Sequence, residues 1–182
     1  MHTCTDPDFS NLLSVLRREV PSRPTLFEFF LNGPLYARLA GLDKEPAWGT
    51  IEGDKMLAKA FMHAGYDYVT LHASAMAFPT AAVDQLASRS MNETAIITDR
   101  ASYEAYSWPD PDSFDYSKLD IVGSELPDGM KIIVCGPGGV LENVMQILGY
   151  EGLCMMMVDD PELVQLIFDE VGSRLVRYYE IC

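Results

Sequence analysis

The sequence predicts an α/β fold whose parallel strands form either an incomplete barrel or a small open sheet. Short apolar runs alternate with amphipathic helical patterns, and most of the connections between them are short. Apolar residues make up 48% of the 182 residues and charged residues 22%, which is enough apolar content for a sizeable core. Because alternating helices and strands favour parallel βαβ units, we expect a parallel sheet.

The amino-terminal part predicts one helix, one strand and a second helix. Asp6 or Ser10 is the expected N-cap of an amphipathic helix that ends before the first prolines. A strand is expected at residues 25–30. The turn residues after it lead into a helix that ends at Gly41.

The same order of elements is repeated further along the chain. Apolar residues at helical spacing predict a helix at residues 51–63, and the apolar run at residues 67–71 predicts a short buried strand. Residues 131–135 are the clearest strand, since they are continuous and rich in β-branched residues. A glycine-rich turn at residues 136–139 then leads into a helix at residues 140–148.

Two regions differ from this alternation. Residues 78–128 predict an excursion of loops and short helices, with one weak β-like piece at residues 95–98. Its aromatic residues need neighbours to pack against: Tyr103, Tyr106, Trp108, Phe114 and Tyr116. The last segment is a long amphipathic helix with Asp159 or Asp160 as N-cap and Pro161 in its first turn.

The number of strands limits the architecture. Three strands are well defined, whereas a closed (β/α)8 barrel has eight and typically needs about 250 residues. We therefore expect residues 1–182 to form one incomplete barrel domain or a small sheet.

Composition excludes several classes of protein. With 13 basic and 27 acidic residues the formal charge is −14, whereas a nucleic-acid-binding surface needs a basic face. The chain has no run of 18 apolar residues and residues 1–9 do not resemble a signal peptide, so we expect a cytoplasmic protein without membrane contact. Its four cysteines lie far apart, which argues against a zinc ribbon or a disulfide framework.

Four stretches carry a resemblance to a known family. Residues 23–30, 64–69, 136–142 and 160–164, in this order and with plausible spacing, resemble the amino-terminal half of the uroporphyrinogen decarboxylase superfamily. That superfamily also contains the corrinoid- and cobalamin-dependent methyltransferases. Its fold is a (β/α)8 barrel. The resemblance therefore implies a partial TIM-type barrel, namely the amino-terminal portion with parallel strands and an excursion of short helices.

The resemblance implies one of two activities. The decarboxylases act on a tetrapyrrole and need no cofactor, whereas the methyltransferases use a corrinoid and a zinc ion held by residues of the later half of the barrel. Phe29 and Gly33 stand nearest to the two arginines with which decarboxylases bind carboxylates, and residues 71–75 lack the aspartate that holds the pyrrole nitrogens. These departures favour methyl transfer, or an unassigned activity, over decarboxylation.

Candidate site residues lie where the predicted strands end, because barrels of this kind place their chemistry there. Glu28 is a candidate acid or base, or else a hydrogen-bond acceptor in a polar pocket. His72 is the best proton-transfer candidate, or else a hydrogen-bonded structural histidine. Cys135 is a buried small hydrophobe or a nucleophile. Gly138 and Gly139 are the candidate cofactor-binding residues, since the amides of their turn can face a cavity.

Two alternative functions remain open. The turn at residues 136–139 and the acidic Asp159 resemble a dinucleotide fingerprint, although Leu141 occupies the third glycine position. A half barrel without catalysis would expose apolar strand edges and helix faces, so it would self-associate or dock on a partner. The sulfur-rich residues 154–157 are expected to fill the core, with copper binding as a remote option, and the acidic residues 110–115 are expected to be solvated.

Overall fold

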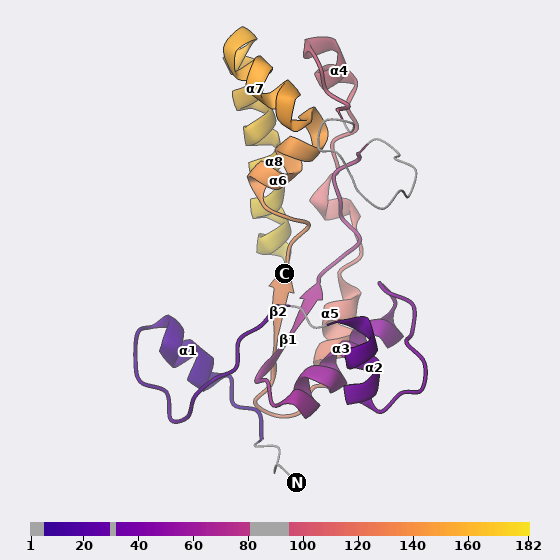
Figure 1. Cartoon of the computed structure of the whole chain (residues 1–182), viewed down its shortest axis with the longest axis vertical. Coiled ribbons are helices and arrows are strands. Elements are labelled where there is room, and N and C mark those ends of the chain that lie inside the picture. The colour runs from indigo at the N-terminus through magenta and orange to yellow at the C-terminus, as the bar shows by residue number, and fades with distance from the viewer. Residues whose placement is uncertain (1–5, 30–31, 81–94) are drawn as a thin grey trace. The chain divides into compact units, whose positions relative to one another are not determined.

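The computed structural model describes residues 6–29, 32–80 and 95–182. They form two compact units, which we describe separately (Figure 1). Unit 1 comprises Met1–Ser74 and Asp115–Cys135, and unit 2 comprises Ala75–Phe114 and Gly136–Cys182. Helices and parallel strands both occur, which confirms the mixed α/β class.

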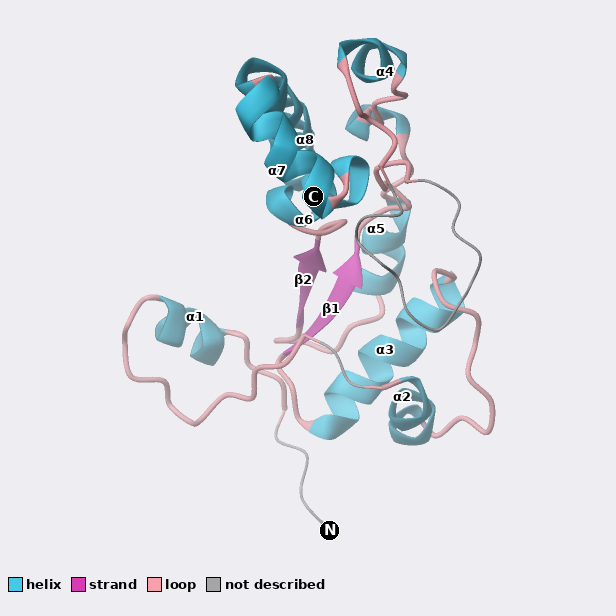
Figure 2. Ribbon diagram, turned by 45° about the horizontal axis from the view of Figure 1, so that its top comes forward, coloured by secondary structure: helices cyan, strands magenta, loops and turns pink. Residues whose placement is uncertain are grey.

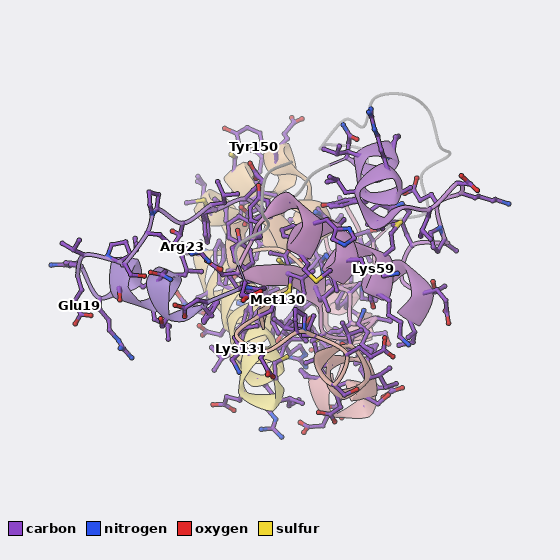
Figure 3. The ribbon with its side chains drawn as sticks, turned by 90° about the horizontal axis from the view of Figure 1, so that it is seen from below. Glu19, Arg23, Lys59, Met130, Lys131 and Tyr150 are labelled. Carbon is purple, nitrogen blue, oxygen red and sulfur yellow. The ribbon has the colours of Figure 1, made fainter. Side chains whose placement is uncertain are left out.

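The sheet of unit 1 has two parallel strands, β1 (Tyr68–His72) and β2 (Lys131–Cys135). In the register Tyr68 pairs with Lys131, and His72 pairs with Cys135. The two strands lie side by side and point in the same direction (Figure 2). Met130 and Lys131, labelled in Figure 3, lie at the amino end of β2, so the carboxyl ends of both strands meet at the opposite edge.

Two helices of unit 1 begin and end with strong local signals. The Asn32 side chain accepts a hydrogen bond at the start of α2 (Gly33–Ala40), and Thr50 does the same for α3 (Ile51–Ala64). The two helices end at Gly41 and Gly65, whose φ values of 72° and 89° lie in the left-handed region that favours glycine. The two predicted helices are thus confirmed.

The other two helices of unit 1 are short. In α1 (Ser10–Leu16) only part of the predicted first helix forms, and α5 (Ser117–Gly123) packs on α3 and β2. The buried carboxylate of Asp67 ties the amino-terminal segment to the start of β1, because it accepts the Asp8 N–H at 2.8 Å and pairs with Arg23.

The core of unit 1 lies between the helices and the strand pair. Three aromatic side chains lie in it, and the Phe61 ring packs at centroid distances of 6.0 Å from Tyr36 and 5.9 Å from Tyr68. Around them pack the other fully or nearly buried side chains: Leu12, Ala37, Ala40, Met56, Leu57, Ala60, Val69, Leu71, Val122 and Met130.

Unit 2 is helical. Its elements are α4 (Arg100–Ala105), the 3-10 turn η1 (Pro111–Ser113), α6 (Val140–Leu148), α7 (Tyr150–Asp159) and α8 (Pro161–Ile181). The last three helices pack against one another. Their buried side chains are Val144, Ile147, Leu148, Leu153, Met156, Leu163, Val164, Ile167, Val171, Leu175 and Tyr178. The predicted helices at residues 140–148 and after Asp160 are confirmed.

The aromatic residues of the excursion pack around Trp108. Its ring lies 4.6 Å from that of Tyr106, 5.8 Å from that of Tyr103 and 6.5 Å from that of Phe78, measured between centroids. The Arg174 guanidinium lies 5.1 Å from the same ring. These contacts hold loop residues of unit 2 against α8.

The structure corrects the predicted first strand. Residues 25–29 run alongside β1 but do not form a strand, and residue 30 lies outside the described part of the chain. The contacts that hold them are made by side chains, since the Tyr68 hydroxyl donates to the Glu28 carbonyl at 2.7 Å and the Thr70 hydroxyl donates to the Phe29 carbonyl at 2.6 Å. A backbone ladder is therefore replaced by side-chain hydrogen bonds.

Other local predictions are also corrected. Residues 95–98 form no strand, although the Ile96 and Ile97 N–H groups both donate to the Ile147 carbonyl. The N-cap of α1 is Phe9 and not Asp6 or Ser10. Of the methionines expected to fill the core only Met156 is buried.

One further observation concerns membranes. Within residues 6–29, 32–80 and 95–182 we find no helix that is both long enough and apolar enough to cross a bilayer.

Candidate functional site

The carboxyl ends of β1 and β2 bring two candidate residues together. His72 and Cys135 are register partners at the last positions of the two parallel strands, so they lie at the same edge of the sheet. The sequence placed both at strand ends, and the structure shows that the two strands are neighbours.

A cavity of about 180 Å³ opens at this edge. Helices α2, α3 and α5, both strands and the loop before α3 supply its walls. Its lining residues are Tyr36, Trp48, Gly49, Asp54, Leu57, Thr70, Leu71, His72, Lys118 and Cys135. All of them belong to unit 1.

An ion pair forms one wall of the cavity. Lys118 Nζ on α5 lies 3.1 Å from Asp54 Oδ2 in the first turn of α3. The exposed fractions of the two side chains are 16% and 8%, so each charge depends on the other for compensation. The pair also joins α5 to α3 beside the carboxyl ends of β1 and β2.

His72 borders the cavity and stays partly open to solvent. The surrounding side chains displace water from the imidazole, which disfavours its charged form and lowers the pKa of His72 below the ordinary value of 6.5. The Lys118 cation lowers the pKa further, and the Asp54 carboxylate opposes this in part. The imidazole is therefore neutral at pH 7, with one nitrogen that donates a hydrogen bond and one that accepts.

Cys135 is half-buried beside it. Burial raises the pKa of the Cys135 thiol, so the thiol stays protonated at neutral pH. A neutral imidazole, a protonated thiol and one ion pair give the cavity no net charge.

Glu28 lies elsewhere in unit 1. Its side chain is exposed, and its Oε1 accepts a hydrogen bond of 2.9 Å from the Phe29 N–H. Its own N–H donates to the Tyr68 hydroxyl at 2.6 Å. Glu28 is not among the residues that line the cavity, so the structure does not bring it to His72.

Gly138 and Gly139 belong to unit 2, and the geometry of the turn explains why glycine stands there. Gly138 has a φ of 96°, and a Cβ there would approach Asn143 Nδ2 to 3.1 Å. Asn143, itself buried, donates from Nδ2 to the carbonyls of Pro137 at 3.0 Å and Gly139 at 2.8 Å. The side chain of Asn143 in α6 therefore closes the turn that precedes this helix.

The dinucleotide alternative needs a second strand after this turn and helix. Residues 155–159 instead lie within α7, which is helical from Tyr150 to Asp159. These residues therefore do not form the βαβ unit of a dinucleotide fold.

Sequence reasoning missed the polar and aromatic side chains that the helices and the loop before α3 contribute to the cavity: Tyr36, Trp48, Asp54 and Lys118. Asp54 and Lys118 are 64 positions apart, so no local motif connects them. Asp54 also has an ordinary explanation in the sequence, because carboxylates are common in the first turn of a helix. Only the packing of α5 on α3 reveals that it has a partner.

The described residues do not fit the cofactors that the resemblance implies. The described ranges contain no group of three or more His, Cys, Asp or Glu residues that could hold a metal ion, so they do not fit a zinc site. The cavity at the strand ends is smaller than the roughly 300–1,000 Å³ typical of drug-sized ligands, and a whole corrinoid does not fit into it.

Comparisons with known proteins gave no match, whether with family models, with curated proteins or with solved structures.

Proposed function

We propose that the chain is the amino-terminal part of an enzyme similar to the uroporphyrinogen decarboxylase superfamily, with its site at the carboxyl ends of β1 and β2. The observation that carries the proposal is the pairing of His72 with Cys135 at the mouth of a cavity that also contains the Lys118–Asp54 pair. Active sites of (β/α)8 barrels lie at this end of their strands.

The succession of motifs supports the family part of the proposal. The stretch at residues 64–69 leads into β1, the stretch at residues 136–142 joins β2 to α6, and the stretch at residues 160–164 begins α8. A β-strand, a crossover and a second parallel strand are the first requirement of a partial barrel. Two strands in register meet this requirement in unit 1.

For the reaction we propose corrinoid-linked methyl transfer in preference to decarboxylation of a tetrapyrrole, with only the small methyl-accepting substrate inside the cavity, which is too small for a corrinoid. Binding of several carboxylates requires an excess of cationic side chains. The single cation of the cavity, Lys118, is already compensated by Asp54. Phe29 and Gly33 supply no charge at the positions where the decarboxylases have arginines.

The role proposed for His72 is proton transfer. A neutral imidazole is ready to accept a proton from a substrate group that becomes a nucleophile, such as a thiol. Loss of hydration and the Lys118 cation both keep the imidazole in this form.

An assay of the purified chain tests the proposal. The chain is incubated with methylated corrinoid plus a thiol and, separately, with uroporphyrinogen. We expect methyl transfer, a decrease of about 100-fold in rate for His72→Asn, and no such decrease for His63→Asn, which changes an exposed histidine of α3. Turnover of uroporphyrinogen contradicts the choice of reaction, and turnover of neither substrate contradicts the enzymatic proposal.

A second candidate function, a half barrel that docks on a partner or a second copy, is favoured by exposed apolar side chains. Val20 is 94% exposed and Leu16 68% exposed in unit 1, and Val158 is 80% exposed in unit 2. Sedimentation velocity at micromolar concentration tests this candidate. A homogeneous monomer contradicts it, whereas a dimer that is weakened by Val20→Lys supports it.

A further inference from the structure

We infer that the cavity at the ends of β1 and β2 binds a small zwitterion of the betaine type, with a quaternary ammonium and a carboxylate on the same carbon atom. The inference rests on the proposed function in taking this cavity as the substrate site, and it adds the chemical class of the ligand. Four features of unit 1 carry it.

The first feature is the charge of the walls. Lys118 contributes one positive charge and Asp54 one negative charge, while His72 and Cys135 are neutral. An ion placed in a partly enclosed site without a counter-charge is costly. The cavity therefore favours a ligand without net charge.

The second feature is the remaining bonding capacity of the ion pair. An ammonium group has three N–H donors and a carboxylate has two oxygens. Asp54 Oδ2 occupies one donor of Lys118, which leaves further donors for a ligand carboxylate. Asp54 Oδ1 remains as an electrostatic partner for a ligand cation. A zwitterion thus complements both members of the pair.

The third feature is the spacing of the two charges. Lys118 Nζ and Asp54 Oδ2 are 3.1 Å apart, so the opposite charges of the ligand must also be close together. An α-amino acid or a betaine has this spacing, whereas an ω-amino acid with a long chain does not.

The fourth feature is the aromatic lining. Tyr36 and Trp48 line the cavity with Asp54, and their rings meet edge to face at a centroid distance of 5.9 Å. Aromatic rings attract quaternary ammonium groups, which form no hydrogen bonds of their own. These rings therefore favour a methylated ammonium over a free amine.

The size of the cavity agrees with such a ligand. A volume of about 180 Å³ lies below the roughly 300–1,000 Å³ of sites for drug-sized ligands, so the cavity suits a smaller molecule. Glycine betaine, with its eight non-hydrogen atoms, is such a molecule. A tetrapyrrole is far larger.

Isothermal titration of the full chain tests the inference. The probes are glycine betaine, acetate, tetramethylammonium and 6-aminohexanoate. We expect saturable binding of glycine betaine, and binding at least about tenfold weaker for the other three, since each lacks one charge or the spacing. Equal binding of acetate, or no binding of glycine betaine at millimolar concentration, overturns the inference.

Variants locate the binding. Lys118→Met and Trp48→Leu should each weaken binding of glycine betaine about tenfold. Lys55→Met is the matched control, because Lys55 pairs with Glu125 outside the cavity. Trp48 is 61% exposed, so Trp48→Leu remains informative if Lys118→Met does not fold. Unchanged affinity in Trp48→Leu places the ligand elsewhere and overturns the inference.

The two proposals fail in different ways. Binding of glycine betaine without methyl transfer retains the ligand class and removes the reaction. Methyl transfer without binding of glycine betaine retains the reaction and removes the ligand class.

Discussion

His72 makes the stability of unit 1 depend on pH. Its pKa is lowered in the folded protein, so the folded state binds fewer protons there than the unfolded state. Its contribution to stability is complete above the ordinary value of 6.5 and is lost as the pH falls below it. We predict that the free energy of unfolding, measured with urea between pH 7.5 and 5, decreases less in His72→Asn than in the unchanged chain.

Substitution of Lys118 tests the cause of the lowered pKa of His72. The Lys118 cation lowers the pKa of His72, and the Asp54 carboxylate raises it. In Lys118→Met the pKa of His72 should therefore rise, and the NMR titration of its ring protons should move to higher pH. A titration that is unchanged in this variant contradicts the proposed origin of the shift.

The Tyr68 hydroxyl makes a second prediction at the residue scale. It accepts a hydrogen bond from the Glu28 N–H and donates one to the Glu28 carbonyl, and so holds residues 25–29 beside β1. Tyr68→Phe should lower the free energy of unfolding by about 1 kcal/mol, because these backbone groups regain water. Chemical denaturation measures the change, and Tyr150→Phe, at an exposed tyrosine of α7, should have no effect.

At the residue scale, the sequence identified candidate residues that stand at the carboxyl ends of predicted strands. His72 and Cys135 were found in this way, and β1 and β2 place them together. Asp54 and Lys118 were not found, because their contact requires two helices to pack. Glu28 was placed at the end of a strand that does not form.

At the scale of the element, the turn before α6 depends on a single buried amide. Asn143 binds the carbonyls of Pro137 and Gly139. Asn143→Leu keeps the size of the side chain but leaves both carbonyls without this donor, so the free energy of unfolding should fall by about 1–3 kcal/mol. Gln146→Leu, at an exposed position of the same helix, is the control. Equal effects of the two substitutions in thermal denaturation contradict this role.

Element boundaries were predictable where the signal is local. The helix ends at Gly41 and Gly65 and the N-cap Asp160 depend on residues within one turn of the boundary. A strand depends on a partner that is distant in sequence. Residues 25–29 have the composition of a strand, yet side chains of β1 hold them where a backbone ladder was expected.

At the scale of the whole molecule, unit 1 is assembled from two separated parts of the chain. Residues 1–74 contain β1, but β2 and α5 come from residues 115–135. A fragment of residues 1–74 should therefore lack a cooperative thermal transition by circular dichroism, whereas the full chain should show one. A cooperative transition in the fragment would mean that β1 and its helices need no second strand.

The partner of β1 also sets the order of events during synthesis. Tyr68 pairs with Lys131, so a ribosome must translate the whole of α4, η1 and α5 before the second strand exists. Domains fold as they emerge, at roughly 5–20 residues per second. For several seconds Val69 and Leu71 on the nascent chain have no sheet to join, and this apolar stretch is where a chaperone would be expected to bind.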